Sequence, residues 1–550
     1  MKKTIFILIA LFGLMYILPL GLRPLVDPDE TRYAEIPREM MASNDWVVPR
    51  LAGVLYFEKP VMGYWANALS MKVFGQNNFA VRFPLAMAAG LSACLVFFLG
   101  RRFSGDPRLA FPSALIFMTF LEVFGVGVFN TLDSLLAFFL TACLSMFFLA
   151  WDSRDSRKHY YFFLFLSGIF CGLACHTKGF LAFVVPISVI VPFVIWEKEW
   201  KRMFTIPWIP ISVALLVMLP WGIMIHLREN DFWNYFFWNE HIRRFLADNA
   251  QHKEPFYYFF GVLILGMFPW TILIPAGISG FRIKGFNTSF RRFTACWFVF
   301  PFLFFSASSG KLATYILPCF PPLALMLTWG LFDYFKRDKR PLFDCALVAL
   351  LLFPVCGITG VLLLQHGFSP DMDELFSDNR KVILFVMAMS AFAFFLLGAL
   401  RQGDIHKKIA LFALSPVLFY TFAHVLTPDQ AVLRNSPVPF ILENKDKIPA
   451  DALIVSPSTP IKSVCWALKR NDIFLLDDGG ELRYGFSQTD QRDRQLSFDA
   501  FNAMVTENKN KRNVVLILDE RRYKRWQDQL PQPDFLIKSG EDGYIFAIFK

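Results

Sequence analysis

The chain has little charge for its length. Only 18% of its 550 residues are Asp, Glu, Lys or Arg, whereas soluble domains carry about 25%. Hydrophobic residues make up 55% of the sequence and aromatic residues 17%, including 65 Phe. This composition excludes an ordinary soluble domain and predicts an integral membrane protein.

The sequence also lacks the spacing patterns of several familiar sites. Its nine cysteines form neither a disulfide framework nor a zinc-ribbon pattern, and only Cys465 belongs to a polar region. We therefore interpret them as small packing residues. The C-terminal region has no P-loop, no Rossmann glycine fingerprint and no nucleophile elbow, so we expect no active site in that region.

Long apolar segments dominate the rest of the chain. The first follows a basic N-terminus and has no small-residue cleavage site after it, so we expect a retained helix. Twelve further segments are long enough to cross a bilayer, which makes thirteen expected spans. The twelve are residues 80–99, 109–126, 132–150, 160–176, 180–196, 205–225, 257–279, 293–306, 316–332, 342–364, 381–399 and 409–425.

The basic residues lie in short clusters between these segments. This distribution argues against nucleic-acid binding, despite a net charge of +10. Alternation of the spans places six connections in the cytoplasm, and these contain 20 Lys and Arg against 8 acidic residues. The excess follows the positive-inside rule, and it predicts a cytoplasmic N-terminus and an extracytoplasmic C-terminus.

Two domains follow from these patterns. We expect residues 1–425 to form an all-α polytopic membrane domain, with interfacial helices within residues 23–80 and a long extracytoplasmic loop at 226–256. Residues 426–550 have strand-length apolar runs and one helical segment near 498–507, which predict a small extracytoplasmic α/β domain. The runs are residues 453–455, 473–476, 514–518 and 544–548.

The densest cluster of charged and aromatic residues lies at residues 26–72. Its first part, DETRYAEIPREM, begins with Asp29 and Glu30. Apolar residues recur in it at helical spacing, which predicts an amphipathic helix on the membrane surface. Pro37 should kink this helix or end it early. One of the two acids can cap the helix while the other reaches a site, and two capping acids are the simpler alternative.

The second part of this segment contains Glu58 and Lys59 directly before Pro60, a favoured residue of a helix's first turn. Lys59 suits a phosphate, and Glu58 suits a cation or a sugar hydroxyl. Charges that only snorkel at the interface are the alternative. His241 and Glu58 together are a weak candidate for a metal site, because two residues are not a signature.

More charged residues are expected on the same extracytoplasmic face. Asp133 begins an apolar helix, where a carboxylate marks either a functional site or a cap. Each base alone can be a snorkelling side chain, but several that converge indicate an anionic headgroup, most simply a phosphate. These further residues are Lys178, Arg243, Lys311 and Tyr315.

The motifs together resemble the lipid-dependent glycosyltransferases of the GT-C class. DETRYAEI and YFEKP are shared widely in that class, including protein mannosyltransferases. TKGFL, FWNYFFW, DNAQH, GKL–TYIL and RNDIFLLDDGGELRYG are more typical of the bacterial family that transfers 4-amino-4-deoxy-L-arabinose to lipid A. Pro37 and Ser309 depart from the family pattern, and Ser309 removes a positive charge beside Lys311.

The resemblance implies a fold of thirteen helices, two interfacial helices and a periplasmic domain in the bacterial inner membrane. It implies that undecaprenyl phosphate carries the aminosugar to a lipid A phosphate, which confers resistance to polymyxin. No cofactor is certain, and a divalent cation, zinc or magnesium, is an open alternative. We expect a monomer.

The expected site combines two catalytic carboxylates, Asp29 and Asp133, with substrate-binding residues. Because the acceptor phosphate is already anionic, it needs little help from a general base. Asp29 is therefore expected to orient the acceptor or to contact the sugar ammonium, and Asp133 to stabilise an oxocarbenium-like sugar. Basic residues offset the repulsion between the two phosphates. The substrate-binding set is Arg32, Tyr33, Tyr56, Lys59, Lys178, Arg243, Lys311 and Tyr315.

Two other functions fit parts of the pattern. One is transfer of mannose or another hexose from a polyprenyl phosphate to protein or lipid. The other is transport of a lipid or sugar. Transport sites lie near the membrane midplane, often in paired repeats, whereas the polar groups here gather on one face and the chain has no internal repeat.

Overall fold

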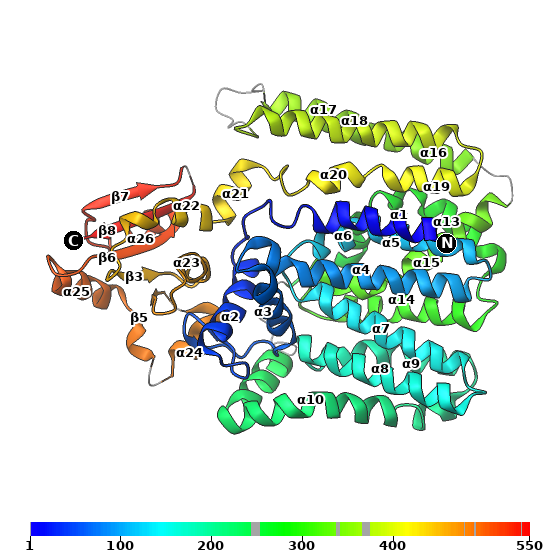
Figure 1. Cartoon of the computed structure of the whole chain (residues 1–550), viewed down its shortest axis with the longest axis horizontal. Helices are drawn as coiled ribbons and strands as arrows, with labels where there is room; N and C mark the ends of the chain where they lie inside the picture. Colours follow the sequence, from blue (N-terminus) through cyan, green and yellow to red (C-terminus); the bar gives the residue numbers. More distant parts are fainter. Residues whose placement is uncertain are drawn as a thin grey trace. The chain divides into compact units, whose positions relative to one another are not determined.

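A computed structural model describes residues 2–243, 253–336, 341–365, 375–477, 479–488, 491–540 and 542–550, without the side chains of 239–243 and 283–284. The chain forms two compact units (Figure 1). Unit 1 comprises Met1–Leu20, Arg82–Glu374 and Asp378–Leu426. Unit 2 comprises Gly21–Val81, Leu375–Ser377 and Thr427–Lys550.

Unit 1 is helical, as its apolar composition requires. Among the described residues, seven helical segments are long and apolar enough to cross a membrane. They are α4 (Asn78–Phe103), α7 (Asp133–Asp152), α8 (Arg157–Lys178), η3 (Trp200–Phe204) with α10 (Trp208–Arg228), η6 (Ala313–Cys319) with α15 (Phe320–Phe335), α16 (Pro341–Leu350) with α17 (Leu352–Gln365), and α18 (Asn379–Arg401).

Two further pairs of helices are bent at a break. The pair α5 (Ala110–Thr119) and α6 (Leu121–Gly127) bends by 64°, and the pair α12 (Tyr258–Gly266) and η5 (Trp270–Leu273) with α13 (Ile274–Lys284) bends by 99°. The Leu121 N–H donates to the Phe268 carbonyl across 3.0 Å. The two breaks therefore satisfy each other's backbone groups, as an apolar environment demands.

The remaining expected spans also fall on helices. These are α1 (Lys2–Phe12) with η1 (Gly13–Ile17), α9 (Leu181–Trp196), α14 (Ser289–Ala307), and α19 (Ile405–Leu414) with α20 (Val417–Phe422). Length and composition identify seven spans in the described residues, or nine if each bent pair is one span. The count of thirteen and the sidedness of the termini stay predictions.

Unit 2 contains a six-stranded sheet in the order β5-β4-β3-β6-β8-β7. The strands β5, β4, β3 and β6 run parallel, and β8 is antiparallel to both β6 and β7. Four strands coincide with the apolar runs noted above, and α25 (Phe498–Asn508) with the expected helix. The strands are β3 (Leu453–Ser456), β4 (Phe474–Leu476), β5 (Gln495–Leu496), β6 (Val514–Asp519), β7 (Phe535–Lys538) and β8 (Tyr544–Phe549).

Shorter elements complete the described chain. In unit 2 they include the hairpin of β1 (Arg50–Leu51) and β2 (Val54–Leu55), and the helices α21 (Asp429–Asn435), α22 (Val438–Glu443), α23 (Ile461–Leu468) and α26 (Glu520–Trp526). Single turns are η2 (Pro107–Leu109), η7 (Lys445–Lys447), η8 (Gly480–Leu482), α24 (Arg483–Phe486) and η9 (Arg492–Arg494), and η4 (Asn234–Arg243) is a π-helix.

The first-loop segment Gly21–Val81 belongs to unit 2, although the sequence placed it with the membrane domain. Its helices are α2 (Asp29–Ser43) and α3 (Met62–Phe74). Every residue of α2 from Glu30 to Met40 is buried, because α3 and α23 pack against it. C-terminal residues therefore cover the polar side of α2, which does not face water, and the place of this helix at the membrane surface stays a prediction.

The helix α2 does not end early at Pro37, because it continues through this residue to Ser43. A proline cannot donate to the carbonyl four residues earlier, here that of Tyr33. The side chain of Asn67 on α3 donates to that carbonyl instead, across 2.9 Å. The packing of α3 thus supplies the hydrogen bond that proline removes from α2.

Candidate functional site

The two acids that begin α2 have different surroundings. Glu30 is fully buried, and its carboxylate accepts from Arg23 at 2.8 Å and from the Val26 N–H at 2.9 Å. Glu30 therefore stabilises the segment that precedes the helix, through Arg23 and Val26. The Asp29 side chain is 49% exposed and pairs with Arg32, whereas the N-cap position of the helix is Pro28. Of the two acids, Asp29 is the one that a substrate can reach.

Arg32 connects Asp29 to the C-terminal part of unit 2. One of its terminal nitrogens pairs with Asp29, and the other lies 2.5 Å from Oε1 of Glu481. The second oxygen of Glu481 lies 3.3 Å from Nζ of Lys462. Two residues of the first loop and two of the C-terminal region thus form one chain of alternating charge.

Aromatic side chains of the first loop lie beside these charges. The Tyr56 hydroxyl donates to Glu58 at 2.9 Å and lies 3.5 Å from Glu481. The guanidinium of Arg32 lies 4.9 Å from the centre of the Tyr33 ring, which stacks on Tyr64. We call Asp29, Arg32, Tyr33, Tyr56, Glu58 and Glu481 the first-loop cluster.

The protonation states in this cluster follow from its charges. Burial raises the pKa of the Glu481 carboxyl, but Arg32 and Lys462 outweigh burial and hold that pKa below its usual value. Burial lowers the pKa of Arg32, and the neighbouring tyrosines and carboxylates more than reverse this effect. Burial raises the pKa of Tyr56 well above its ordinary value. Glu481 is therefore anionic at neutral pH, and Tyr56 is a neutral hydrogen-bond donor.

Lys59 turns its ammonium toward the backbone. Its Nζ donates to the carbonyl of Glu58 across 2.9 Å. A lysine side chain has several rotatable bonds, so its ammonium can be redirected toward an anion. The position of Lys59 is therefore compatible with the expected phosphate contact.

A second cluster in unit 1 joins three residues that the sequence singled out separately. Nζ of Lys178 lies 2.6 Å from Oδ1 of Asp133, and 5.5 Å from the centre of the Tyr315 ring. Asp133 begins α7, and Lys178 ends α8 because Gly179 adopts a positive φ of 78°. We call Asp133, Lys178 and Tyr315 the Asp133 cluster.

The Asp133 cluster lines a cavity. The cavity is small, with a volume of about 10 Å³, which is roughly enough for one water molecule. Its walls include Leu136, Phe305 and Thr314 besides the three members of the cluster. The side chains of Asp133 and Lys178 are only 10% and 13% exposed. An anion that enters here would meet a partly desolvated ammonium, where charge interactions are strong.

The remaining expected ligands, Lys311, Arg243 and His241, do not belong to either cluster as described. Lys311 is buried, and its Nζ donates to the carbonyls of Glu254, at 2.8 Å, and of Ser308. These contacts favour a structural role that fastens the loop around Gly310. Arg243 and His241 lie in η4 by their backbone, but their side chains lie outside the described residues.

Sequence reasoning missed Glu481, Lys462 and Tyr64. Tyr64 is fully buried, and no hydrogen-bond partner of its hydroxyl lies among the described residues. Glu481 stands in the GGEL motif of the C-terminal region, where no active site was expected. The carboxylate directly after two glycines was the available signal, but nothing in the spacing linked it to Arg32.

Two protein families match parts of the chain. The family described as dolichyl-phosphate-mannose-protein mannosyltransferase matches residues 1–236. The family described as arabinosyl transferase ArnT, C-terminal domain, matches residues 432–546.

Curated relatives match nearly the whole chain. A relative from Shewanella sediminis is 35% identical over 550 residues, which covers 99% of this chain and 98% of the relative. One from Edwardsiella ictaluri is 37% identical over 546 residues and covers 98% of both. Both are named undecaprenyl phosphate-alpha-4-amino-4-deoxy-L-arabinose arabinosyl transferase.

A solved structure shares the fold. ArnT from Cupriavidus metallidurans, crystallised with undecaprenyl phosphate, superposes with a TM-score of 0.83 at 22% identity, over 100% of this chain and 98% of that protein. The described helices and the C-terminal sheet therefore form a known architecture.

Proposed function

Because the chain belongs to the undecaprenyl phosphate-alpha-4-amino-4-deoxy-L-arabinose arabinosyl transferase family, we propose that it transfers 4-amino-4-deoxy-L-arabinose from undecaprenyl phosphate to a phosphate of lipid A. The chain is a glycosyltransferase and a multi-pass membrane protein. The observation that carries the proposal is the similarity of 35–37% identity to such transferases along almost the entire chain.

The reaction exchanges one phosphate ester for another at the anomeric carbon. An oxygen of the acceptor phosphate bonds to that carbon, and the bond to the oxygen of the carrier phosphate breaks. Undecaprenyl phosphate leaves with the electron pair, so no proton must move. The difficulty is electrostatic, since two anions approach a sugar that becomes oxocarbenium-like. Fixed charges of the protein should therefore supply most of the catalysis.

The Asp133 cluster suits a phosphate and the sugar's developing charge. Lys178 offers an ammonium beside a cavity, and Asp133 holds that ammonium in place at 2.6 Å. When a phosphate binds the Lys178 ammonium, the Asp133 carboxylate becomes available to stabilise a positive charge nearby. We assign to Lys178 the contact with a phosphate and to Asp133 the stabilisation of the sugar.

The first-loop cluster suits a sugar that carries an ammonium. Asp29 and Glu481 are carboxylates held by Arg32, and Tyr56 presents a hydroxyl between Glu58 and Glu481. Carboxylates and tyrosines are typical partners for ammonium and hydroxyl groups. We assign to Asp29 an orienting contact, with Lys59 as a further phosphate ligand.

We further propose that the reaction takes place on the periplasmic face of the bacterial inner membrane and protects against polymyxin. A phosphate that receives an aminosugar loses part of its attraction for a cationic peptide, because a positive charge now lies beside it. Deletion of the chain should abolish the aminosugar on lipid A and raise sensitivity to polymyxin.

A transfer assay tests the substrate assignment. The purified full-length chain in detergent is mixed with lipid A and with undecaprenyl phosphate that carries either the aminosugar or mannose. The expected result is an acceptor whose mass rises by one aminosugar, with release of undecaprenyl phosphate. Transfer of mannose alone would favour the second candidate, hexose transfer, which the match of residues 1–236 to mannosyltransferases supports.

A further inference from the structure

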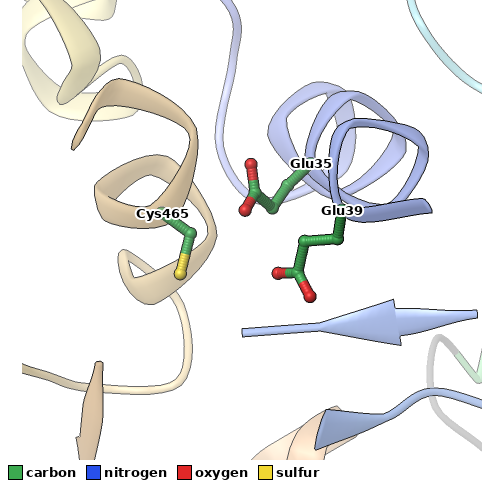
Figure 2. Close-up of side chains that lie close together, drawn as sticks. All are labelled: Glu35, Glu39 and Cys465. Atoms are coloured by element: carbon green, nitrogen blue, oxygen red, sulfur yellow. The ribbon is translucent and has the colours of Figure 1, made fainter. Parts of the chain in front are cut away.

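A group of three potential metal ligands lies inside unit 2, apart from the first-loop cluster. Glu35 and Glu39 lie one helical turn apart on α2, and Cys465 lies on α23. Figure 2 shows the three side chains turned into the space between the two helices. One donor atom from each lies within 4.8 Å of the others. All three residues are buried, with exposed fractions of 0%, 3% and 0%.

The carboxylates of Glu35 and Glu39 differ in the partners that surround them. Arg38 lies beside Glu35 and donates from Nε across 2.7 Å as well as from a terminal nitrogen. Among the described residues Glu39 has no arginine partner of this kind. Its Oε2 accepts from the Gly53 N–H at 3.0 Å. Its Oε1 has no donor among the described residues, and a proton held between the Glu35 and Glu39 carboxyls is the alternative to a cation. A buried carboxylate oxygen without a partner is costly unless a proton or a cation joins it.

The identity of the donors narrows the choice of cation. A thiolate is a soft ligand that magnesium and calcium avoid, whereas zinc accepts thiolate and carboxylate together. Bonds of about 2.0–2.3 Å to zinc require a small inward movement of the three side chains. The second oxygen of a carboxylate or a water can complete four ligands. We propose that Glu35, Glu39 and Cys465 form a structural site for a thiophilic divalent cation such as zinc.

Binding of the ion displaces protons from its ligands. Burial and the charge of Glu35 raise the pKa of the Glu39 carboxyl, and burial with both carboxylates raises that of the Cys465 thiol. Because carboxylates and thiolates bind a metal in their deprotonated form, the ion displaces any protons that these ligands carry, and the protons pass to solvent. Lys469 and Arg494 lie close enough to affect these groups and remain compatible with either state.

Such an ion would fasten α2 to α23. The first of these helices carries Asp29 and Arg32, and the second carries Lys462, which contacts Glu481. The ion would therefore stabilise the arrangement of unit 2 rather than touch a substrate. This inference does not rest on the proposed function, because metal content and spectra test it without any assay of transfer.

The experiment uses the purified full-length chain in detergent. Metal is removed with a chelator, and zinc or cobalt(II) alone is then added. Zinc should bind, and cobalt should give a thiolate-to-metal absorption band. Cys465→Ala should abolish the band, and Cys465→Ala and Glu39→Gln should each weaken zinc binding at least tenfold.

Two controls locate the ion. Cys345→Ala removes an exposed thiol of unit 1, and Glu58→Gln removes the other candidate metal ligand of unit 2. Both should leave the thiolate-to-metal band unchanged, because neither removes a member of the group of Glu35, Glu39 and Cys465. If Cys465→Ala does not fold, the weaker zinc binding of the isosteric Glu39→Gln variant carries the test. Absence of the band in the wild type, or an unchanged zinc affinity in Glu39→Gln, would overturn the proposal.

Discussion

The guanidinium of Arg32 lies 2.5 Å from the carboxylate of Glu481, although 449 positions separate the two residues in the chain. The Arg32 side chain is 9% exposed and that of Glu481 is 31% exposed. The same guanidinium pairs with Asp29, the expected catalytic carboxylate. The C-terminal region thus contributes a charged residue to the first-loop cluster, and this residue contacts the same guanidinium as Asp29.

We expect Glu481→Gln to lower the rate of transfer about ten- to a hundredfold. A hydrogen bond to a charged group contributes about 1.5–3 kcal/mol, and the amide leaves Arg32 and Lys462 without their shared anion. Asp472→Asn is the matched control, because it breaks an ion pair with Arg470 in which Asp472 is 62% exposed. Rates of purified variants with the aminosugar donor provide the measurement. Equal effects of the two substitutions would contradict a role of Glu481 in the site.

Asp29→Asn should lower transfer by a factor of about a hundred or more, while folding and membrane insertion stay intact. The reason is that a fixed charge near the reacting centre is worth about that much, whereas a half-exposed side chain contributes little to stability. Glu30→Gln should show the opposite pattern, with a lower melting temperature and a smaller effect on rate, because Glu30 is buried against Arg23. Wild-type rates in Asp29→Asn would remove Asp29 from the mechanism.

The sequence identified part of the site because membrane segments make polar residues conspicuous. Asp133 lies at the start of one apolar segment and Lys178 at the end of another, and alternation of the spans placed both residues on one face. The distance of 2.6 Å between them agrees with that prediction. Glu481 escaped notice because a charged residue is ordinary in a polar region. Its role depends on a contact with Arg32 that no local periodicity records.

The ion pair of Asp133 and Lys178 should be strongly coupled. Removing one partner of a buried pair costs about 3–5 kcal/mol of stability. Asp133→Asn and Lys178→Met should therefore each destabilise the protein. The double variant should lose less stability than the sum of the two single losses. The control is the pair of Arg102 and Asp152, whose side chains are 49% and 40% exposed. Exposed pairs are worth about 0–1 kcal/mol.

Unfolding of the single and double variants in detergent measures both couplings. Each pair includes one residue of α7, at opposite ends of that helix. A coupling of the exposed pair as large as that of the buried pair would show that burial is not the cause. Transfer assays on the same variants should show losses only for Asp133 and Lys178.

Stability should depend on pH through Asp27. Burial raises the pKa of this carboxyl from 3.8 to about 6, against the opposing effects of Lys462 and of hydrogen bonds from Thr31 and Ser463. The folded state holds the proton more tightly than the unfolded state. The resulting stability is complete below pH 3.8 and is lost as the pH rises through about 6, with a total loss of about 3 kcal/mol.

Asp27→Asn should therefore stabilise the protein above pH 7 and change little at pH 4. The asparagine oxygen can still accept from Thr31 and from Ser463, which lies 2.9 Å from Oδ1. Melting temperatures of the wild type and the variant, measured across this pH range, provide the test. A difference between them that does not grow with pH would contradict the assignment to Asp27.

The hydrogen bond from Asn67 to the Tyr33 carbonyl explains how α2 tolerates Pro37, and it can be tested by a double substitution. Asn67→Ala leaves a buried carbonyl without this donor, which should cost about 1–3 kcal/mol. Pro37→Ala restores an N–H that can donate to the same carbonyl within the helix. Asn67→Ala should therefore cost much less in the Pro37→Ala background than in the wild type. Equal costs in both backgrounds, measured by unfolding, would show that Asn67 stabilises α2 through packing alone.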